Sequence, residues 1–145
     1  MEDKYNLQRF IKEQQRDYST AYVEISQGRK RSHWMWWIFP QIEGLGMTAT
    51  SHKYSIKSME EAIAFLAHPY LGKNIREISA ELLKLDTNDA SYVMGYPDDL
   101  KLRSSMTLFA EAAPEETVFQ KVLDKFYDGK KDDRTLAILN EQNNR

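Results

Sequence analysis

The chain has 145 residues, the length of one ordinary domain, and it is long enough to bury a hydrophobic core of its own. It contains no cysteine, which excludes disulfides and thiolate metal sites, and its three histidines are widely spaced, so we expect no metal and no cofactor. The formal net charge of −2 gives no general attraction to nucleic acid or to membranes, and without a bilayer-spanning apolar run or a secretory signal we expect a cytoplasmic protein.

Apolar side chains recur at spacings of three and four along residues 7–25, which predicts a long first helix. A glycine follows at the position of a left-handed helix cap. Residues 34–41 fit a short helix that a proline ends, because a strand would need a partner strand that no other stretch supplies. Residues 47–57 show no clear period, although Tyr54 and Ile56 are expected to be buried.

The second half of the chain carries clearer helical signals. Ser58 and Glu61 are spaced as a capping box in front of an apolar stripe at residues 59–66. A proline then restarts the chain into residues 71–85, which have the most regular helical period of the protein. Further helices are predicted at residues 92–95, 98–113, 115–126 and 134–140, before a polar tail at residues 141–145.

No alternating strand pattern, repeat or linker is visible. We therefore predict an all-α fold: a single multihelical domain of about seven helices with no sheet, covering residues 1–145 with its core within residues 5–140. The predicted core consists of apolar side chains on the inner faces of these helices: Phe10, Tyr18, Ile38, Phe39, Ile63, Leu66, Leu71, Ile75, Ile78, Leu82, Met106, Phe109, Val122 and Phe126.

Three motifs stand out in chain order. The first is Gly28-Arg-Lys-Arg-Ser-His-Trp-Met-Trp-Trp-Ile-Phe-Pro-Gln-Ile-Glu-Gly-Leu-Gly46, which contains all three tryptophans. The others are Leu66-Ala-His-Pro-Tyr-Leu-Gly72 and Pro97-Asp-Asp-Leu-Lys-Leu-Arg-Ser-Ser-Met-Thr-Leu-Phe109. In this order and at these distances, the chain resembles domain of unknown function family 1810 over nearly its whole length.

The resemblance implies a small all-α protein, and it supplies no established activity and no catalytic residues. Some members of that family carry the name calpastatin. A periodic, aromatic chain without repeats is unlike that disordered and repetitive inhibitor, so the name gives no guide to function here.

The tryptophan motif is the first candidate site, because basic side chains beside large aromatic rings can hold an anion against an indole wall. Its basic residues are Arg29, Lys30, Arg31 and His33, and His33 is the candidate proton carrier near neutral pH. A solvated basic segment after a helix end is the simpler interpretation. Three tryptophans within four helical residues cannot share one direction, so we expect at least two in the core. The remaining ring either joins the core, which is the more common position for a large aromatic side chain, or lines a pocket or stacks on a base or sugar.

The helix from residue 98 supplies the second candidate group. Lys101, Ser104 and Ser105 lie at positions i, i+3 and i+4, so they share one helix face. A desolvated lysine beside a serine can act as its base, although both residue types are common on solvent-facing helix surfaces. We predict that this face approaches His33, Trp37 or Gln41 across one cleft. The predicted ligand-binding residues are Arg29, Arg31, His33, Trp37, Gln41, Lys101, Ser104 and Ser105, with His33, Lys101 and Ser105 as candidate catalytic residues.

The function that these residues favour is binding of a small anionic ligand, such as a nucleotide or a sugar phosphate, by a binding protein or an enzyme. The alternative is a protein-interaction module with an exposed tryptophan and arginine patch. RNA binding is a third hypothesis, because the same residues stack on bases and contact phosphates, but the acidic balance of the chain disfavours it. A concave pocket would favour the first interpretation and a flat apolar patch the second.

Overall fold

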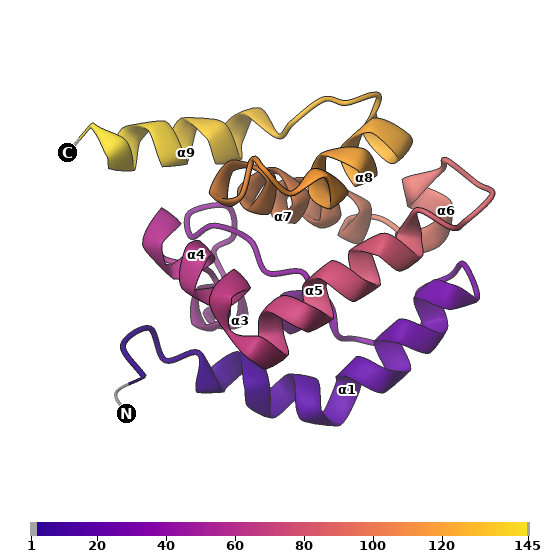
Figure 1. Ribbon diagram of the computed structural model, residues 1–145, viewed down its shortest axis with the longest axis horizontal. Coiled ribbons are helices and arrows are strands. Elements are labelled where there is room, and N and C mark those ends of the chain that lie inside the picture. Colours follow the sequence, from indigo (N-terminus) through magenta and orange to yellow (C-terminus); the bar gives the residue numbers. More distant parts are fainter. Residues whose placement is uncertain (1–2, 145) are drawn as a thin grey trace.

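The computed structural model describes residues 3–144, and within them the chain forms nine helices and no sheet (Figure 1). In chain order the helices are α1 (Gln8–Ser26), α2 (Met35–Ile38), α3 (Ala49–Lys53), α4 (Met59–Ala67), α5 (Pro69–Leu82), α6 (Ala90–Met94), α7 (Asp98–Ala112), α8 (Thr117–Tyr127) and α9 (Asp133–Asn143). The predicted all-α class and single domain are confirmed. The predicted number of about seven helices is wrong.

The helix α3 shows why that number was too low. It has five residues, too few for an apolar period to be recognised, and it lies in the stretch without a clear pattern. Its start signal is the Thr48 hydroxyl, which accepts the Ser51 amide at 3.0 Å. The long α9 also continues to Asn143, three residues beyond the expected end, so most of the predicted polar tail is helical. Arg145 lies outside the described residues.

The helix α5 is at the centre of the fold. It packs against α1 on one side and against α4 and α8 on the others, and Figure 1 shows it crossing the middle of the molecule between α1 and the α7–α8 pair. Its predicted stripe is buried as expected: Leu71, Ile75, Ile78 and Leu82 are all at most 1% exposed. Such side chains each contribute roughly 1.5–3 kcal/mol when removed from water, so this stripe anchors the surrounding helices.

Two predicted core residues differ from expectation: Tyr18 is only partly buried against the core, and Ile63 is wrong. Ile63 is 50% exposed, whereas Phe65 two residues later is fully buried. The cause is Glu61, which is 1% exposed because its carboxylate turns inward to an arginine. With Glu61 directed inward, α4 is rotated so that Ala62, Phe65 and Leu66 face the core and Ile63 faces solvent. A buried acidic residue on an apolar helix cannot be recognised without its partner.

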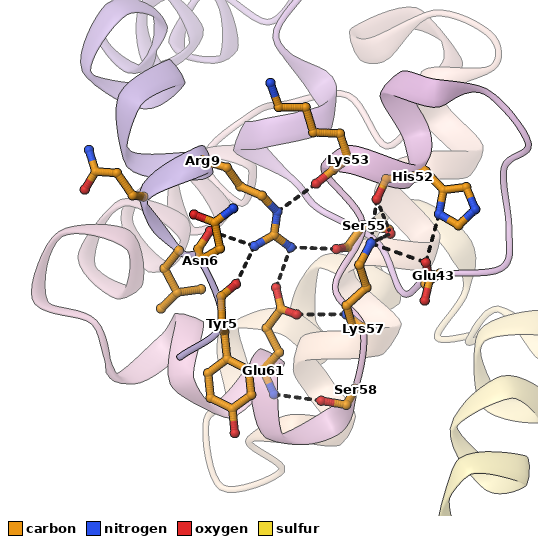
Figure 2. A network of polar contacts seen from close by, with 12 residues as sticks. Tyr5, Asn6, Arg9, Glu43, His52, Lys53, Ser55, Lys57, Ser58 and Glu61 are labelled. Atoms are coloured by element: carbon orange, nitrogen blue, oxygen red, sulfur yellow. Dashed lines mark hydrogen bonds and ion pairs between the residues drawn. The ribbon is translucent and has the colours of Figure 1, made fainter. Parts of the chain in front are cut away.

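That partner is Arg9 of α1, whose side chain is 7% exposed at the centre of the polar network in Figure 2. Its guanidinium donates to Glu61 Oε2 at 2.6 Å and to the main-chain oxygens of Tyr5, Asn6, Lys53 and Ser55 at 2.6–2.8 Å. Glu61 also accepts the Lys57 amide at 3.0 Å. Because the charges of Arg9 and Glu61 are satisfied by each other and by these hydrogen bonds, we assign the pair a structural role: it ties α1 to α3 and to the start of α4.

Candidate functional site

The basic residues of the tryptophan motif are folded around a buried carboxylate. Glu24 of α1 is 8% exposed and accepts the amides of Arg31 at 2.8 Å and Ser32 at 3.0 Å, and the Trp34 indole N–H at 2.9 Å. The Ser32 hydroxyl donates to its second oxygen. Burial alone would raise the pKa of Glu24, but the hydrogen bonds from Ser32, Arg31 and Trp34 outweigh burial and lower that pKa to about 2.

Lys30 is the buried cation of this segment. Its ammonium lies 2.8 Å from Asp98 Oδ2, donates to the Ser32 carbonyl at 2.6 Å and sits 4.9 Å from the centroid of the Trp34 ring. Since the Lys30 side chain is only 8% exposed, its charge is balanced inside the fold. We call Glu24, Lys30, Ser32, Trp34 and Asp98 the Glu24 cluster.

The other predicted ligands of the motif lie on the surface. Arg29, Arg31 and His33 are exposed, and the Arg29 guanidinium stacks on Tyr92 at 5.4 Å from the ring centroid. Trp37 is partly buried, where its indole N–H donates to Asp17 at 2.9 Å and its ring meets Tyr54 edge-on. These contacts fix the motif on α1.

A cleft of about 280 Å³ opens on the other side of the motif, and we call it the α7–α9 cleft. Its walls come from three segments that are far apart in sequence: the end of the tryptophan motif, the first half of α7 and the start of α9. The side chains that matter for its chemistry are Trp36, Gln41, Lys101, Arg103, Ser104 and Arg134. Apolar contributions from Leu45 and Leu100 complete the walls.

Two of the three cations that line this cleft, Arg103 and Arg134, have no carboxylate partner among the described residues of the kind that Lys30 has in Asp98. Arg103 donates to the main-chain oxygens of Lys130 and Lys131 at 2.9 Å, so its partners are neutral and its charge is not compensated. Arg134 is exposed and forms no ion pair with any residue between 3 and 144. The Lys101 ammonium covers the Trp36 ring at 4.1 Å from the centroid and lies 3.3 Å from Asp98 Oδ1.

The carboxylate in the cleft wall is occupied by helix capping. Asp132 Oδ2 accepts the amide of Thr135 at 3.0 Å and its hydroxyl at 2.6 Å, which caps the start of α9. The starts of α7 and α9 both face the cleft, and the first N–H groups of a helix carry partial positive charge. The side chains that line the cleft therefore carry more positive than negative charge, with Lys101, Arg103 and Arg134 against Asp132.

Two glycines of the motif, Gly46 at the cleft and Gly44 beside it, leave no room for a side chain. A Cβ added to Gly46 would lie 2.7 Å from the Ser51 Cβ, so the loop packs directly onto α3. Gly44 has a φ of +110°, and a Cβ there would lie 3.2 Å from Ile138 of α9. Behind this wall is a chamber of about 20 Å³, large enough for one water molecule, to which Gln41 and Ser51 contribute.

Of the residues predicted from the sequence, the structure brings Gln41, Lys101 and Ser104 together in the cleft. Arg29, Arg31, His33 and Trp37 do not line it. Ser105 is fully buried, and its hydroxyl has no hydrogen-bond partner in the described part of the chain, so it cannot meet a ligand from solvent.

Sequence reasoning missed Trp36, Arg103 and Arg134. One signal was available for Arg134: it stands in the first turn of a helix, where the dipole disfavours a cation. A cation kept at such a position indicates a partner that is not part of the helix. No local signal separates Trp36 from its neighbours, because which of the three rings reaches the cleft depends on what packs against each of them.

Within residues 3–144 no helix is long and apolar enough to cross a membrane, and no three His, Cys, Asp or Glu side chains gather as metal ligands would. A family model described as a protein of unknown function, DUF1810, matches residues 4–139. The fold is similar to the crystal structure of a conserved hypothetical protein from Mycobacterium tuberculosis, with a TM-score of 0.93 and 42% sequence identity over 95% of this chain and 99% of the other. The search of curated proteins finds no match.

Proposed function

The chain belongs to the DUF1810 family of proteins of unknown function, and we propose that it binds a small anionic ligand in the α7–α9 cleft. The observation that carries this proposal is the pair Arg103 and Arg134. Both line the cleft, they come from different helices, and neither forms an ion pair within residues 3–144. Unpaired arginines on a concave surface are costly in self-repulsion unless an anion binds between them.

The walls indicate what the anion is attached to. Trp36, Leu45 and Leu100 add apolar side chains to the lining that holds the arginines. A ligand with a flat or apolar body and an anionic end fits this division, and Gln41 and Ser104 provide polar side chains for orientation. A volume of about 280 Å³ is near the lower limit of small-molecule sites, which favours a compact ligand such as a sugar phosphate or a mononucleotide.

The test is isothermal titration calorimetry with a panel of mononucleotides and sugar phosphates, after a thermal-shift screen of the same compounds. We expect at least one compound to bind, and we expect Arg134→Gln to weaken its binding about tenfold or more, since a charge-assisted hydrogen bond is lost. The matched control is Arg31→Gln, which removes an exposed arginine of the Glu24 cluster region and leaves the cleft intact. Equal weakening of ligand binding by both variants would show that the compound does not bind in the cleft.

A second function, protein interaction, is supported by a separate observation. Next to the cleft, Tyr96 is 81% exposed, Met47 97% and Leu100 49%, and these are residue types that interfaces use as anchors. A benzophenone photo-cross-linker placed at position 96 should then capture one defined partner from the cell of origin. Loss of that adduct in Met47→Ser, together with failure of every compound in the calorimetry panel, would favour this second function.

A further inference from the structure

We infer that the ligand of the α7–α9 cleft carries a phosphate monoester in its doubly charged form, and that the cleft selects it over singly charged anions. This inference rests on the proposed function and specifies its ligand class. It is carried by the balance of charges around the cleft, which the positions of Asp98 and Asp132 decide.

Asp98 is shared between two lysines. Its Oδ2 lies 2.8 Å from Lys30 and its Oδ1 lies 3.3 Å from Lys101, so one negative charge faces two positive charges. Asp132 is the carboxylate among the side chains that line the cleft, and its Oδ2 caps the start of α9. The charged side chains that line the cleft are three cations, Lys101, Arg103 and Arg134, and one carboxylate, Asp132, which leaves an excess of two positive charges in its wall.

Two uncompensated charges match a dianion. Singly charged anions such as carboxylates and sulfate esters would leave one positive charge unpaired, in a cleft whose apolar walls reduce solvent screening. The planar guanidinium groups present forked donors that match phosphate oxygens. The cleft is therefore suited to a phosphate with both ionisable oxygens deprotonated.

The body of the ligand follows from Trp36. Lys101 occupies one position over that ring, while the remaining indole surface lines the cleft beside Leu45 and Leu100. Flat rings stack on indole surfaces, so the phosphate is expected to be attached to a ring of similar size. The volume of the cleft is near the lower limit of small-molecule sites, which favours a ligand with one ring system and one phosphate group.

The experiment compares phenyl phosphate with phenyl sulfate, two probes of nearly the same shape that differ in charge. At about pH 8 we expect phenyl phosphate to bind about tenfold more tightly, since the phosphate is then a dianion. At about pH 5 its second proton is bound and the preference should disappear, because the second pKa of a phosphate monoester is about 6.

The same experiment also controls for protonation changes of the protein's own side chains between the two pH values. The groups facing the ligand are Lys101, Arg103 and Arg134, with Asp98 and Asp132 beside them, and His52 and Glu43 line the neighbouring chamber. Phenyl sulfate stays singly charged over this range, so a change in its affinity reports these protein groups alone. The ratio of the two affinities then isolates the charge of the probe.

Two variants make the result specific to this cleft. Arg134→Gln should abolish most of the preference for phosphate, and Arg134→Lys should restore it, because lysine keeps the charge. Arg134 is exposed, so both variants are expected to fold. Restoration by lysine is a readout that a merely structural role of Arg134 would not produce.

The outcomes separate the two proposals. Equal affinity for both probes at about pH 8 would overturn the dianion inference and leave binding of a small anion intact. Failure of both probes and of the whole calorimetry panel would overturn the proposed function itself. Much tighter binding of a phosphotyrosyl peptide than of phenyl phosphate would also overturn the inference, since the ligand would then be a macromolecule rather than a compact phosphate.

Discussion

Two regions of this protein combine lysine, arginine and tryptophan, and they use them in opposite ways. In the Glu24 cluster Lys30 lies over Trp34, and in the α7–α9 cleft Lys101 lies over Trp36. The two regions differ in what their carboxylates bind. Glu24 is buried at the centre of the first region and takes up its donors, whereas Asp132, the carboxylate that lines the second, caps the start of α9 and forms no ion pair with Arg103 or Arg134. A candidate binding site is therefore distinguished from a structural cluster by cations that have no ion-pair partner, and not by the number of its basic residues.

The largest effect that this comparison predicts is on stability when Glu24 is removed. Glu24→Ala leaves the Trp34 indole and two main-chain amides without acceptors, so we expect the free energy of unfolding to fall by about 3–4 kcal/mol. Urea unfolding followed by circular dichroism measures it. Glu60→Ala, a change at an exposed glutamate of α4, serves as the control and should have little effect. A small effect of Glu24→Ala would mean that water replaces the lost oxygens.

The second prediction concerns acid. The folded pKa of Glu24 is about 2, below its ordinary value of 4.5, so its contribution to stability is complete above pH 4.5 and is lost as pH falls towards 2. The difference between the two pKa values corresponds to about 3 kcal/mol. Other carboxylates act in the same direction, so the measurement is the difference between the pH–stability curves of the wild type and Glu24→Gln. Parallel curves over this range would contradict the low pKa.

The third prediction separates the two tryptophans. Trp34 is 1% exposed and donates to Glu24, so Trp34→Phe should lower the free energy of unfolding by about 2 kcal/mol through the lost hydrogen bond and the space left behind. Trp36→Phe should cost about 1 kcal/mol or less and should weaken ligand binding instead. Thermal unfolding and calorimetry on both variants test whether Trp34 serves stability and Trp36 serves binding. Equal losses of stability in the two variants would contradict this assignment.

The smallest effect concerns Asp98, which belongs to both regions. Lys30→Met should cost about 1 kcal/mol, because Lys101 still neutralises Asp98. The double variant Lys30→Met with Lys101→Met should cost more than the sum of the single changes, since Asp98 is then unpaired. A double-mutant cycle of unfolding free energies measures this coupling. Strict additivity would show that Asp98 is solvated well enough to need neither lysine.

The sequence was sufficient for the parts of the fold that depend on local period. The stripe Leu71, Ile75, Ile78 and Leu82 is visible without coordinates, because apolar side chains recur on one helix face whatever they pack against. Ile63 shows the limit of this reasoning. Its exposure follows from the inward turn of Glu61, whose partner Arg9 lies more than fifty residues earlier in the chain.

The candidate site was only partly predictable for the same reason. Lys101, Ser104 and Gln41 were identified from their residue types and do meet in one cleft. The basic run Arg29–Arg31 looked more favourable than Arg103 and Arg134, which have no tryptophan beside them in the sequence. Whether a cation is free depends on carboxylates that approach from other helices, and neither composition nor spacing contains that information.

The anchoring of α9 has a consequence for ligand binding. Of its eleven residues only Thr135 and Leu139 are buried, and it lies along the edge of the molecule in Figure 1. A helix held by so few contacts undocks more readily than α5 or α7, which are buried along their length. Each time α9 undocks, Arg134 leaves Arg103. The apparent affinity is then the intrinsic affinity multiplied by the fraction of molecules with α9 docked, and ligand binding in turn raises that fraction.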